Sequence, residues 1–208
     1  MKSELIKSIN DSIDAVAQLR EPHAQTFIEE FALLLAECFR NGNKVLIAGN
    51  GGSLCDAMHF SEELTGFFRT SRAALPAIAL SEPGHITCTA NDLSFEWIFA
   101  RGVQALGKPG DLFVGLTTSG NSPNIVKAVE VASQLGLKTV TFLGKDGGRL
   151  KGVADLELII KGFKTSDRIQ EAHMAAIHIT IQLMEYYLFP NLLPAVEKEC
   201  LVSSESSK

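Results

Sequence analysis

The sequence has no stretch of about 18 uncharged apolar residues, which is the length that a membrane-spanning helix requires. Residues 1–20, MKSELIKSINDSIDAVAQLR, carry acidic side chains where a secretory signal peptide has an apolar block. The chain also lacks a long basic run, and its formal net charge of −5 disfavours nucleic acid or an anionic membrane as the main partner. We therefore expect a cytoplasmic protein that binds neither nucleic acid nor a membrane.

Cysteine is scarce, and the four cysteines are widely spaced. None of them forms a C-x-x-C pair, so the sequence indicates neither a structural zinc site nor a disulfide scaffold. Apolar residues are abundant, because 46 % of the 208 residues are hydrophobic, enough to bury the core of one large domain. We expect this domain to span residues 1–194, with an N-terminal helical extension, and residues 195–208 to form a frayed tail.

Hydrophobic periodicity and turn residues divide the chain into alternating strands and helices. An apolar stripe near the N-terminus predicts an amphipathic helix through the spacing of Leu5, Ile9, Ile13 and Val16. Further helices are predicted at 22–40, 53–68, 84–104, 123–135, 147–152 and 166–188. Strands are predicted at 44–48, 76–80, 111–116, 138–143 and 155–160. This alternation predicts an α/β fold in which a five-stranded parallel sheet has helices on both faces.

A glycine-rich turn follows the first predicted strand. The segment Gly49-Asn50-Gly51-Gly52-Ser53 combines glycines, which permit a tight turn, with a serine that can cap the next helix. Free N–H groups at a helix N-terminus attract anions, so the turn is a candidate phosphate site. It is not the dinucleotide fingerprint, whose third glycine would fall at Leu54, and it lacks the Gly-Lys-Ser/Thr of a P-loop. Taken alone, such a turn can also merely join two elements.

A second turn, rich in hydroxyl groups, follows the predicted strand at 111–116. It reads Thr117-Thr118-Ser119-Gly120-Asn121-Ser122 and leads into a helix that starts at Pro123. Helix capping accounts for Ser122 and Pro123, but it does not require the three hydroxyls that open the turn. Open α/β sheets bind ligands at the carboxyl ends of strands, where the strand order switches. The two turns together predict a phosphate site built from neutral donors.

Two further clusters carry groups suited to acid–base chemistry. His59 and Glu63 are four residues apart on the helix after the glycine turn, so they face the same way. On the last helix, Gln170 and His178 are separated by about 12 Å of helix rise. They meet at one small site only by reaching toward each other or by coming from two copies of the helix, and both arrangements indicate an oligomer. The simpler interpretation of each cluster is a partly solvated helix face, with Ser166 as the cap of the last helix.

Five sequence segments that contain or flank these turns and clusters occur in order along the chain, namely GNGGSLCDAMHFSEELTG at 49–66, AND at 90–92, TSGNS at 118–122, LGKDGG at 143–148 and DRIQEAHM at 167–174. Through them the chain resembles the phosphoheptose isomerases of the sugar-isomerase (SIS) fold over about residues 1–190. The resemblance implies a flavodoxin-like three-layer fold. It also implies conversion of D-sedoheptulose 7-phosphate into D-glycero-D-manno-heptose 7-phosphate, the first step towards the heptose of bacterial lipopolysaccharide and related surface polysaccharides. Members are homotetramers with active sites between subunits, and several bind a metal, usually zinc, which implies one zinc ion per subunit here.

The resemblance also implies roles for individual residues. Glu63 and His178 match the catalytic acid/base pair, and the zinc ligands match His59, Glu63, Gln170 and His178, an oxygen and nitrogen set suited to zinc. The substrate-binding positions match Asn50, Gly51, Gly52, Ser53, Glu63, Asn91, Asp92, Thr117, Thr118, Ser119, Ser122, Asp167 and Gln170. One position departs from the pattern, because Phe67 stands where relatives have an arginine; Arg69 and Arg72 are the candidates to compensate.

The residues suit the chemistry that the resemblance implies. Moving a proton between C1 and C2 through an enediol needs a base near the carbon and an acid at the oxygens, and modest burial brings the pKa of a glutamate or histidine near 7. No lysine lies in the three clusters, so a Schiff-base route lacks a nucleophile. The alternative is a non-catalytic SIS tetramer that binds the bacterial replication initiator or senses a sugar phosphate. Glu63 favours the enzyme, because initiator-binding relatives lack this glutamate.

Overall fold

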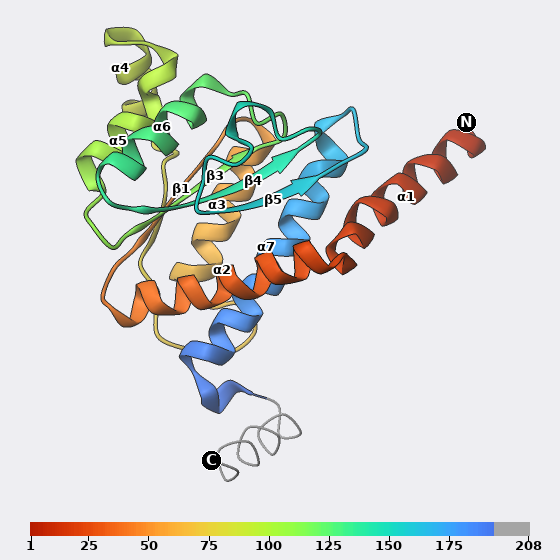
Figure 1. The fold of residues 1–208 in the computed structure, drawn as a ribbon, viewed down its shortest axis with the longest axis horizontal. Helices are drawn as coiled ribbons and strands as arrows, with labels where there is room; N and C mark the ends of the chain where they lie inside the picture. Colours follow the sequence, from red (N-terminus) through yellow and green to blue (C-terminus); the bar gives the residue numbers. More distant parts are fainter. Residues whose placement is uncertain (194–208) are drawn as a thin grey trace.

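The computed structural model describes residues 1–193, in which a five-stranded sheet is flanked by helices (Figure 1). The strands are all parallel and lie in the order β2-β1-β3-β4-β5. Their bounds are β1 Val45–Gly49, β2 Ala77–Ala79, β3 Leu112–Thr117, β4 Lys138–Gly144 and β5 Leu156–Ile160. The central strands are apolar along their length because both of their faces are covered; β1 is buried at every residue. The predicted parallel α/β sheet is confirmed.

Helices cover both faces of the sheet. In the described range the α-helices are α1 Lys2–Ala17, α2 Pro22–Arg40, α3 Gly52–Thr65, α4 Pro83–Asp92, α5 Ile98–Leu106, α6 Pro123–Gln134 and α7 Ser166–Leu188. The apolar residues of β1 alternate between two clusters: Val45 and Ile47 pack with α2, α3 and α7, whereas Leu46 and Ala48 pack with α5 and α6. This alternation is the period-2 pattern of a strand, and it produces the three layers of the fold.

A group of aromatic rings anchors the layer that contains α2 and α3. Phe31 lies 5.8 Å from Phe27, 6.1 Å from Phe60 and 5.8 Å from Phe142, measured between ring centroids. These rings come from α2, α3 and β4, and Phe31, Phe60 and Phe142 are fully buried. Such pairs add to the free energy of burial, so α3 is fixed against the sheet. That matters for function because α3 carries the glycine turn at one end and His59 and Glu63 further along.

Two predicted helices differ from the structure. The segment predicted as one helix at 84–104 is broken, because α4 ends at Asp92 and α5 begins at Ile98 after a 3-10 turn at Phe95–Trp97. Ser94, between them, has an extended backbone with φ −173° and ψ 166°. Asn, Asp and Ser side chains compete for backbone hydrogen bonds and so favour helix ends. The predicted helix at 147–152 is only a 3-10 turn, Gly148–Leu150, and both its first residue and the preceding Gly147 have positive φ.

The N-terminal helix α1 extends away from the sheet and packs against α7 (Figure 1). Its apolar stripe is largely open to solvent within this single chain, with Leu5, Ile9 and Ile13 between 50 % and 61 % exposed. None of the helices in residues 1–193 is long and apolar enough to cross a membrane. The predicted tail at 195–208 lies outside the described residues.

Candidate active site

The glycine turn and the hydroxyl turn meet where the strand order of the sheet switches. β1 and β3 are neighbours, with Gly49 opposite Leu116, and the chain leaves β1 toward α3 but leaves β3 toward α6 on the other face. The crevice that opens between two such connections is where open α/β sheets bind ligands. A cavity of about 360 Å³ lies there. It is lined by Asn50, Gly52, Ser53, Leu116, Thr117, Thr118, Ser122, Ser166 and Gln170.

Close backbone approaches explain the glycines of the first turn. A Cβ at Gly49 would lie 2.3 Å from the carbonyl oxygen of Ser53, and one at Gly52 would lie 2.6 Å from the side-chain amide of Gln170. Gly51 has φ +55° and is the N-cap residue of α3. The sequence prediction that Ser53 caps this helix is therefore wrong. Ser53 lies in the first turn of α3, and its hydroxyl accepts a hydrogen bond from Gln170 Nε2 at 3.3 Å.

The hydroxyls of the second turn that line the cavity are hydrogen-bonded to one another or to the start of α7. Thr117 Oγ1 lies 3.0 Å from Ser122 Oγ, and Thr118 Oγ1 lies 3.0 Å from Ser166 Oγ. Ser122 occupies the N-cap position of α6 as predicted, but its hydroxyl makes no capping bond. For α7, the predicted cap at Ser166 is wrong because Thr165 is the N-cap residue. The cavity thus presents uncharged hydroxyls near the N-termini of α3, α6 and α7, which is a suitable environment for an anion.

Ser119 is placed differently from the other hydroxyl residues. Its Oγ accepts a hydrogen bond from the backbone N–H of Asn121 at 3.2 Å, and its carbonyl accepts one from Asn121 Nδ2 at 2.9 Å. Ser119 is not among the cavity-lining residues. In this structure its side chain stabilises the turn itself.

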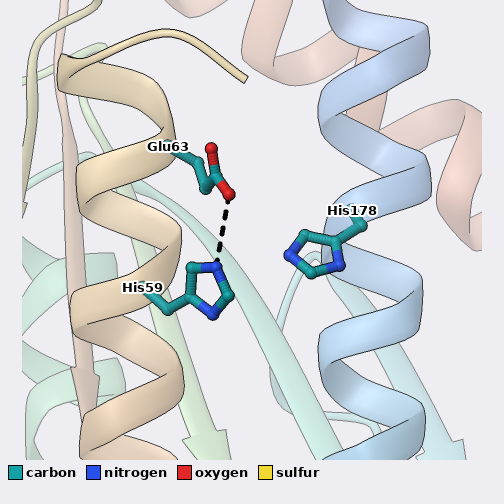
Figure 2. Close-up of side chains that lie close together, drawn as sticks. All are labelled: His59, Glu63 and His178. Atoms are coloured by element: carbon teal, nitrogen blue, oxygen red, sulfur yellow. Dashed lines mark hydrogen bonds and ion pairs between the residues drawn. The ribbon is translucent and has the colours of Figure 1, made fainter. Parts of the chain in front are cut away.

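A compact acid/base cluster joins α3 to α7. His59 and Glu63 point from α3 toward His178 of α7 (Figure 2). His59 Nε2 lies 3.2 Å from Glu63 Oε1, and the rings of His59 and His178 are 5.0 Å apart. The Nε2 atom of His178 is buried and has no hydrogen-bond partner among the described residues. Burial is also the main cause that lowers the pKa of His178, followed by the nearby His59. Both effects favour the neutral form of this imidazole.

Known proteins with similar sequences and structures identify the family. A model described as an SIS domain matches residues 7–144. The chain is 58 % identical over 172 residues to the phosphoheptose isomerase of Fusobacterium nucleatum, an overlap that covers 83 % of this chain and 88 % of the relative. It is 49 % identical over 187 residues to that of Photorhabdus laumondii, covering 89 % and 97 %. The chain belongs to the phosphoheptose isomerase family.

Solved structures of phosphoheptose isomerases agree with this membership. Those from Neisseria gonorrhoeae and Francisella tularensis each match with a TM-score of 0.81, at 32 % and 34 % identity. Each match covers 88 % of this chain and 98 % of the solved chain.

The acid/base cluster of this family member fits a metal ion. One ligand atom from each of His59, Glu63 and His178 can be chosen so that all three lie within 4.8 Å of one another. Two imidazole nitrogens and a carboxylate oxygen form a donor set that zinc accepts. The unpartnered Nε2 of His178 is the observation that fits best, because a buried nitrogen lone pair is costly unless something binds it. Gln170, the fourth predicted ligand, instead donates to Ser53, and both residues line the cavity between the glycine turn and the hydroxyl turn.

Six predicted substrate-binding residues do not line the cavity of the described chain, namely Gly51, Glu63, Asn91, Asp92, Ser119 and Asp167. Asn91 and Asp92 are exposed at the end of α4, where Asn91 Nδ2 donates to Asp92 Oδ1 at 2.8 Å and Cys88 Sγ donates to Asp92 Oδ2 at 3.4 Å. The same two bonds, that of Asn91 first, lower the pKa of Asp92. Asp167 is exposed at the start of α7, and its pKa is lowered first by the Thr165 hydroxyl and then by the N–H of Arg168.

Two residues near the site escaped the sequence reasoning. Asn124 is buried in α6 and forms two 2.9 Å hydrogen bonds with Asn50, which joins the two turns. The sequence feature that could have revealed Asn124 is a polar amide among the apolar residues at the start of a helix.

Asp56 lies seven residues before Glu63, on the same face of α3. Burial raises its pKa to about 6, and its Oδ2 has no partner among the described residues. The sequence could have revealed Asp56 only through a search of the whole helix face that also carries Glu63.

Proposed function

We propose that the chain isomerises D-sedoheptulose 7-phosphate to D-glycero-D-manno-heptose 7-phosphate, a step that supplies heptose for bacterial surface polysaccharides. One observation carries the proposal: α3 begins at the glycine turn, the candidate phosphate site, and further along presents His59 and Glu63 toward His178. About 9 Å of helix rise separates Ser53 from His59, so the two ends of an open-chain sugar phosphate can meet different parts of one site. The names of the relatives at 58 % and 49 % identity support the substrate.

In the proposed reaction, two protons move and no redox cofactor is needed. Glu63 takes a proton from C1 of the ketose, and the carbonyl oxygen at C2 receives a proton from a water molecule or from the imidazole N–H of His178, which gives the enediol. Glu63 then returns its proton to C2, and the C1 hydroxyl gives its proton back to that water or imidazole as the aldehyde forms. Glu63 lies partly buried beside His59, which positions the carboxylate, and the neutral imidazole of His178 can relay protons at the oxygens. The hydroxyls of Ser53, Thr118 and Ser122 hold the phosphate.

We further propose one zinc ion per subunit, held by His59, Glu63 and His178, with Gln170 as the fourth ligand that the family resemblance implies. Such an ion supplies Lewis-acid polarisation of the sugar carbonyl. The buried Nε2 of His178 supports this assignment. Gln170 contacts Ser53 in the described chain, so its role as a ligand stays a prediction.

We also infer that the protein works in the cytoplasm as a homotetramer with sites shared between subunits. Two features support the assembly. The apolar stripe of α1 is exposed in the single chain, and burying it against another copy would be favourable. Asn91 and Asp92 lie at the exposed end of α4 rather than at the cavity of their own chain, where a neighbouring site can use them.

The test is to incubate the purified protein with sedoheptulose 7-phosphate and to follow the sugar by NMR. The expected result is the appearance of a heptose 7-phosphate with an aldehyde-derived C1, and exchange of one carbon-bound proton with solvent. The same experiment with Glu63→Gln controls for a contaminating isomerase. Tight binding of the sugar without turnover by the parent protein would contradict the proposal and favour a sugar-phosphate sensor.

A further inference from the structure

The two helices that carry the acid/base cluster are joined by one buried ion pair outside the cluster. Arg72, in the segment after α3, donates from Nε to Oε1 of Glu185 on α7 at 2.7 Å. The two side chains are only 2 % and 5 % exposed. Glu185 lies seven residues after His178, which places both on the same face of α7, toward α3. The pair therefore connects the segment after α3 to α7, about two helical turns beyond His178.

The same guanidinium group holds the end of α3 at Glu63. Arg72 Nη2 donates to the carbonyl oxygen of Glu63 at 2.7 Å, and Nη1 donates to those of Leu64 and Gly66, both at 2.8 Å. Carbonyls in the last turn of a helix lack partners within the helix. Arg72 satisfies them and so fixes the backbone of the residue that we assign as the base.

Arg72 also holds together the two ends of the segment 67–72, which packs on His178. Its Nη1 bonds the carbonyls of Gly66 and Ala73, on either side of the segment 67–72. Within that segment, the ring of Phe68 stacks on the imidazole of His178, with centroids 5.5 Å apart and planes inclined by 28°. One side chain thus fixes the backbone of Glu63 and the ring that packs on His178.

We propose that Arg72 and Glu185 form a positioning pair that sets the relative placement of Glu63 and His178. The proposal rests on the proposed function of that cluster. Stability alone is a weak explanation of the pair, because replacing a buried ion pair with apolar residues is often neutral or stabilising. A positioning role requires the planar fork of arginine, which directs several donors at once, and lysine cannot reproduce it.

The test compares Arg72→Lys and Glu185→Gln with the parent protein in three measurements. These are kcat and KM with sedoheptulose 7-phosphate, the zinc affinity of the metal-free protein in competition with a chelator, and the thermal midpoint. We expect kcat and zinc affinity to fall by about 10- to 100-fold, as they do when the residues that orient metal ligands are changed. KM should stay unchanged because the phosphate cavity is separate from the pair.

Asp111→Asn is the matched control. Asp111 is fully buried and pairs with Lys44 at 2.5 Å, but it lies at the amino ends of β1 and β3, at the other end of the sheet from the site. It also accepts the N–H groups of Lys44 and Lys108 at 3.0 Å. This variant should lower the thermal midpoint and leave kcat and zinc affinity unchanged. An Arg72→Lys protein that behaves in the same way would overturn the positioning role.

A second variant covers the case in which the single substitutions prevent folding. Arg72→Met combined with Glu185→Leu removes both charges and fills the space with apolar groups, which preserves folding more often than breaking one partner does. Parental kcat and zinc affinity in this folded variant would refute the proposal, and a loss of both would support it. If the parent protein itself lacks isomerase activity, the proposed function fails, whereas the zinc measurement still tests the pair.

Discussion

The side-chain amides of Asn50 and Asn124 form two hydrogen bonds with each other, each 2.9 Å long, across the switch point between β1 and β3. Asn50 belongs to the glycine turn, and Asn124 is the second residue of α6, after the hydroxyl turn. Asn124 is only 1 % exposed, so the pair is a buried connection between the glycine turn and the helix that follows the hydroxyl turn.

The pair should couple stability to substrate affinity. In Asn124→Ala the amide of Asn50 loses its partner, and we expect a cost of about 1–3 kcal/mol in the free energy of unfolding together with a higher KM. Asn50→Ala should behave alike. The double variant should cost less than the sum of the two, since the interaction is lost only once. Additive effects in urea unfolding and in KM would show that the amides do not act together.

The phosphate contact can be tested at Ser53. Ser53→Ala removes a hydroxyl from the cavity, and we expect KM for sedoheptulose 7-phosphate to rise by about 10- to 100-fold, the value of a hydrogen bond to a charged group of about 1.5–3 kcal/mol. The kcat should stay close to the parental value. Ser61→Ala is the control, because Ser61 lies on the same helix but its hydroxyl donates to the carbonyl of Ala77. An unchanged KM for Ser53→Ala would remove this serine from the site.

Ser119→Ala gives a further comparison at the hydroxyl turn. The sequence alone predicts a direct phosphate contact and hence a higher KM. In the structure the Ser119 hydroxyl bonds the Asn121 N–H within the turn, so we expect the rise in KM to come with a lower thermal midpoint. A higher KM at parental stability would instead favour a direct contact with the phosphate.

The sequence was sufficient to predict the sheet because each strand is an apolar run bounded by turn residues. It also located the glycine turn and the hydroxyl turn, since glycines permit tight turns and hydroxyls at strand ends can bind an anion. The break at Leu93 and Ser94 was missed because apolar residues continue at helical spacing on both sides of it, whereas the departure lies in the backbone of these two residues.

Most of the features that could not be predicted from the sequence depend on contacts between residues that are distant along the chain. Arg72 and Glu185 are 113 residues apart, and no local pattern marks either of them as a partner of the other. Likewise, Ser119 and Ser122 were both predicted to bind substrate, although only Ser122 lines the cavity and the Ser119 hydroxyl accepts the N–H of Asn121. Side-chain direction in a turn depends on neighbours such as the loop after β4, where the Arg149 N–H donates to Asn121 at 3.0 Å.

The assignment of Glu63 as base leads to a prediction about kcat. Glu63→Gln preserves the size of the side chain but removes the basic carboxylate, so we expect kcat to fall by roughly 10²–10⁴ with folding intact. Zinc should bind more weakly, and added zinc should restore metal content without restoring the rate. Glu30→Gln, at an exposed position on α2, is the control. Near-parental kcat in folded Glu63→Gln would refute the base assignment.

The exposed stripe of α1 predicts how the assembly can be broken. Ile9→Glu combined with Ile13→Glu places two charges on residues that are 50 % and 60 % exposed in the single chain. If another copy buries them, the tetramer should dissociate to a smaller species in light scattering, since burying unpaired charge is costly. Val153→Glu, at a similarly exposed apolar residue distant in sequence, should leave the mass unchanged. A stable and fully active monomer of the parent protein would contradict the shared site.

The buried His173 predicts how stability depends on pH. It is fully buried on α7, and its Nε2 lies 2.9 Å from the carbonyl oxygen of Leu143. Burial lowers its pKa from 6.5 to about 4, so the unfolded chain binds a proton in this range that the folded chain does not. The stability contributed by the neutral form is therefore complete above pH 6.5 and is lost as the pH falls to about 4.

Integrating that difference gives a loss of about 3 kcal/mol in the free energy of unfolding between pH 6.5 and 4. His173→Gln removes the titrating group while an amide N–H can still donate to Leu143. We expect this variant to be less stable than the parent protein at pH 7.5 but to lose less stability on acidification, as measured by urea unfolding at several pH values. His23→Gln, at an exposed position on α2, should reproduce the parental pH dependence. If His173→Gln and the parent lose equal stability between pH 6.5 and 4, protonation of His173 is not what destabilises the fold in acid.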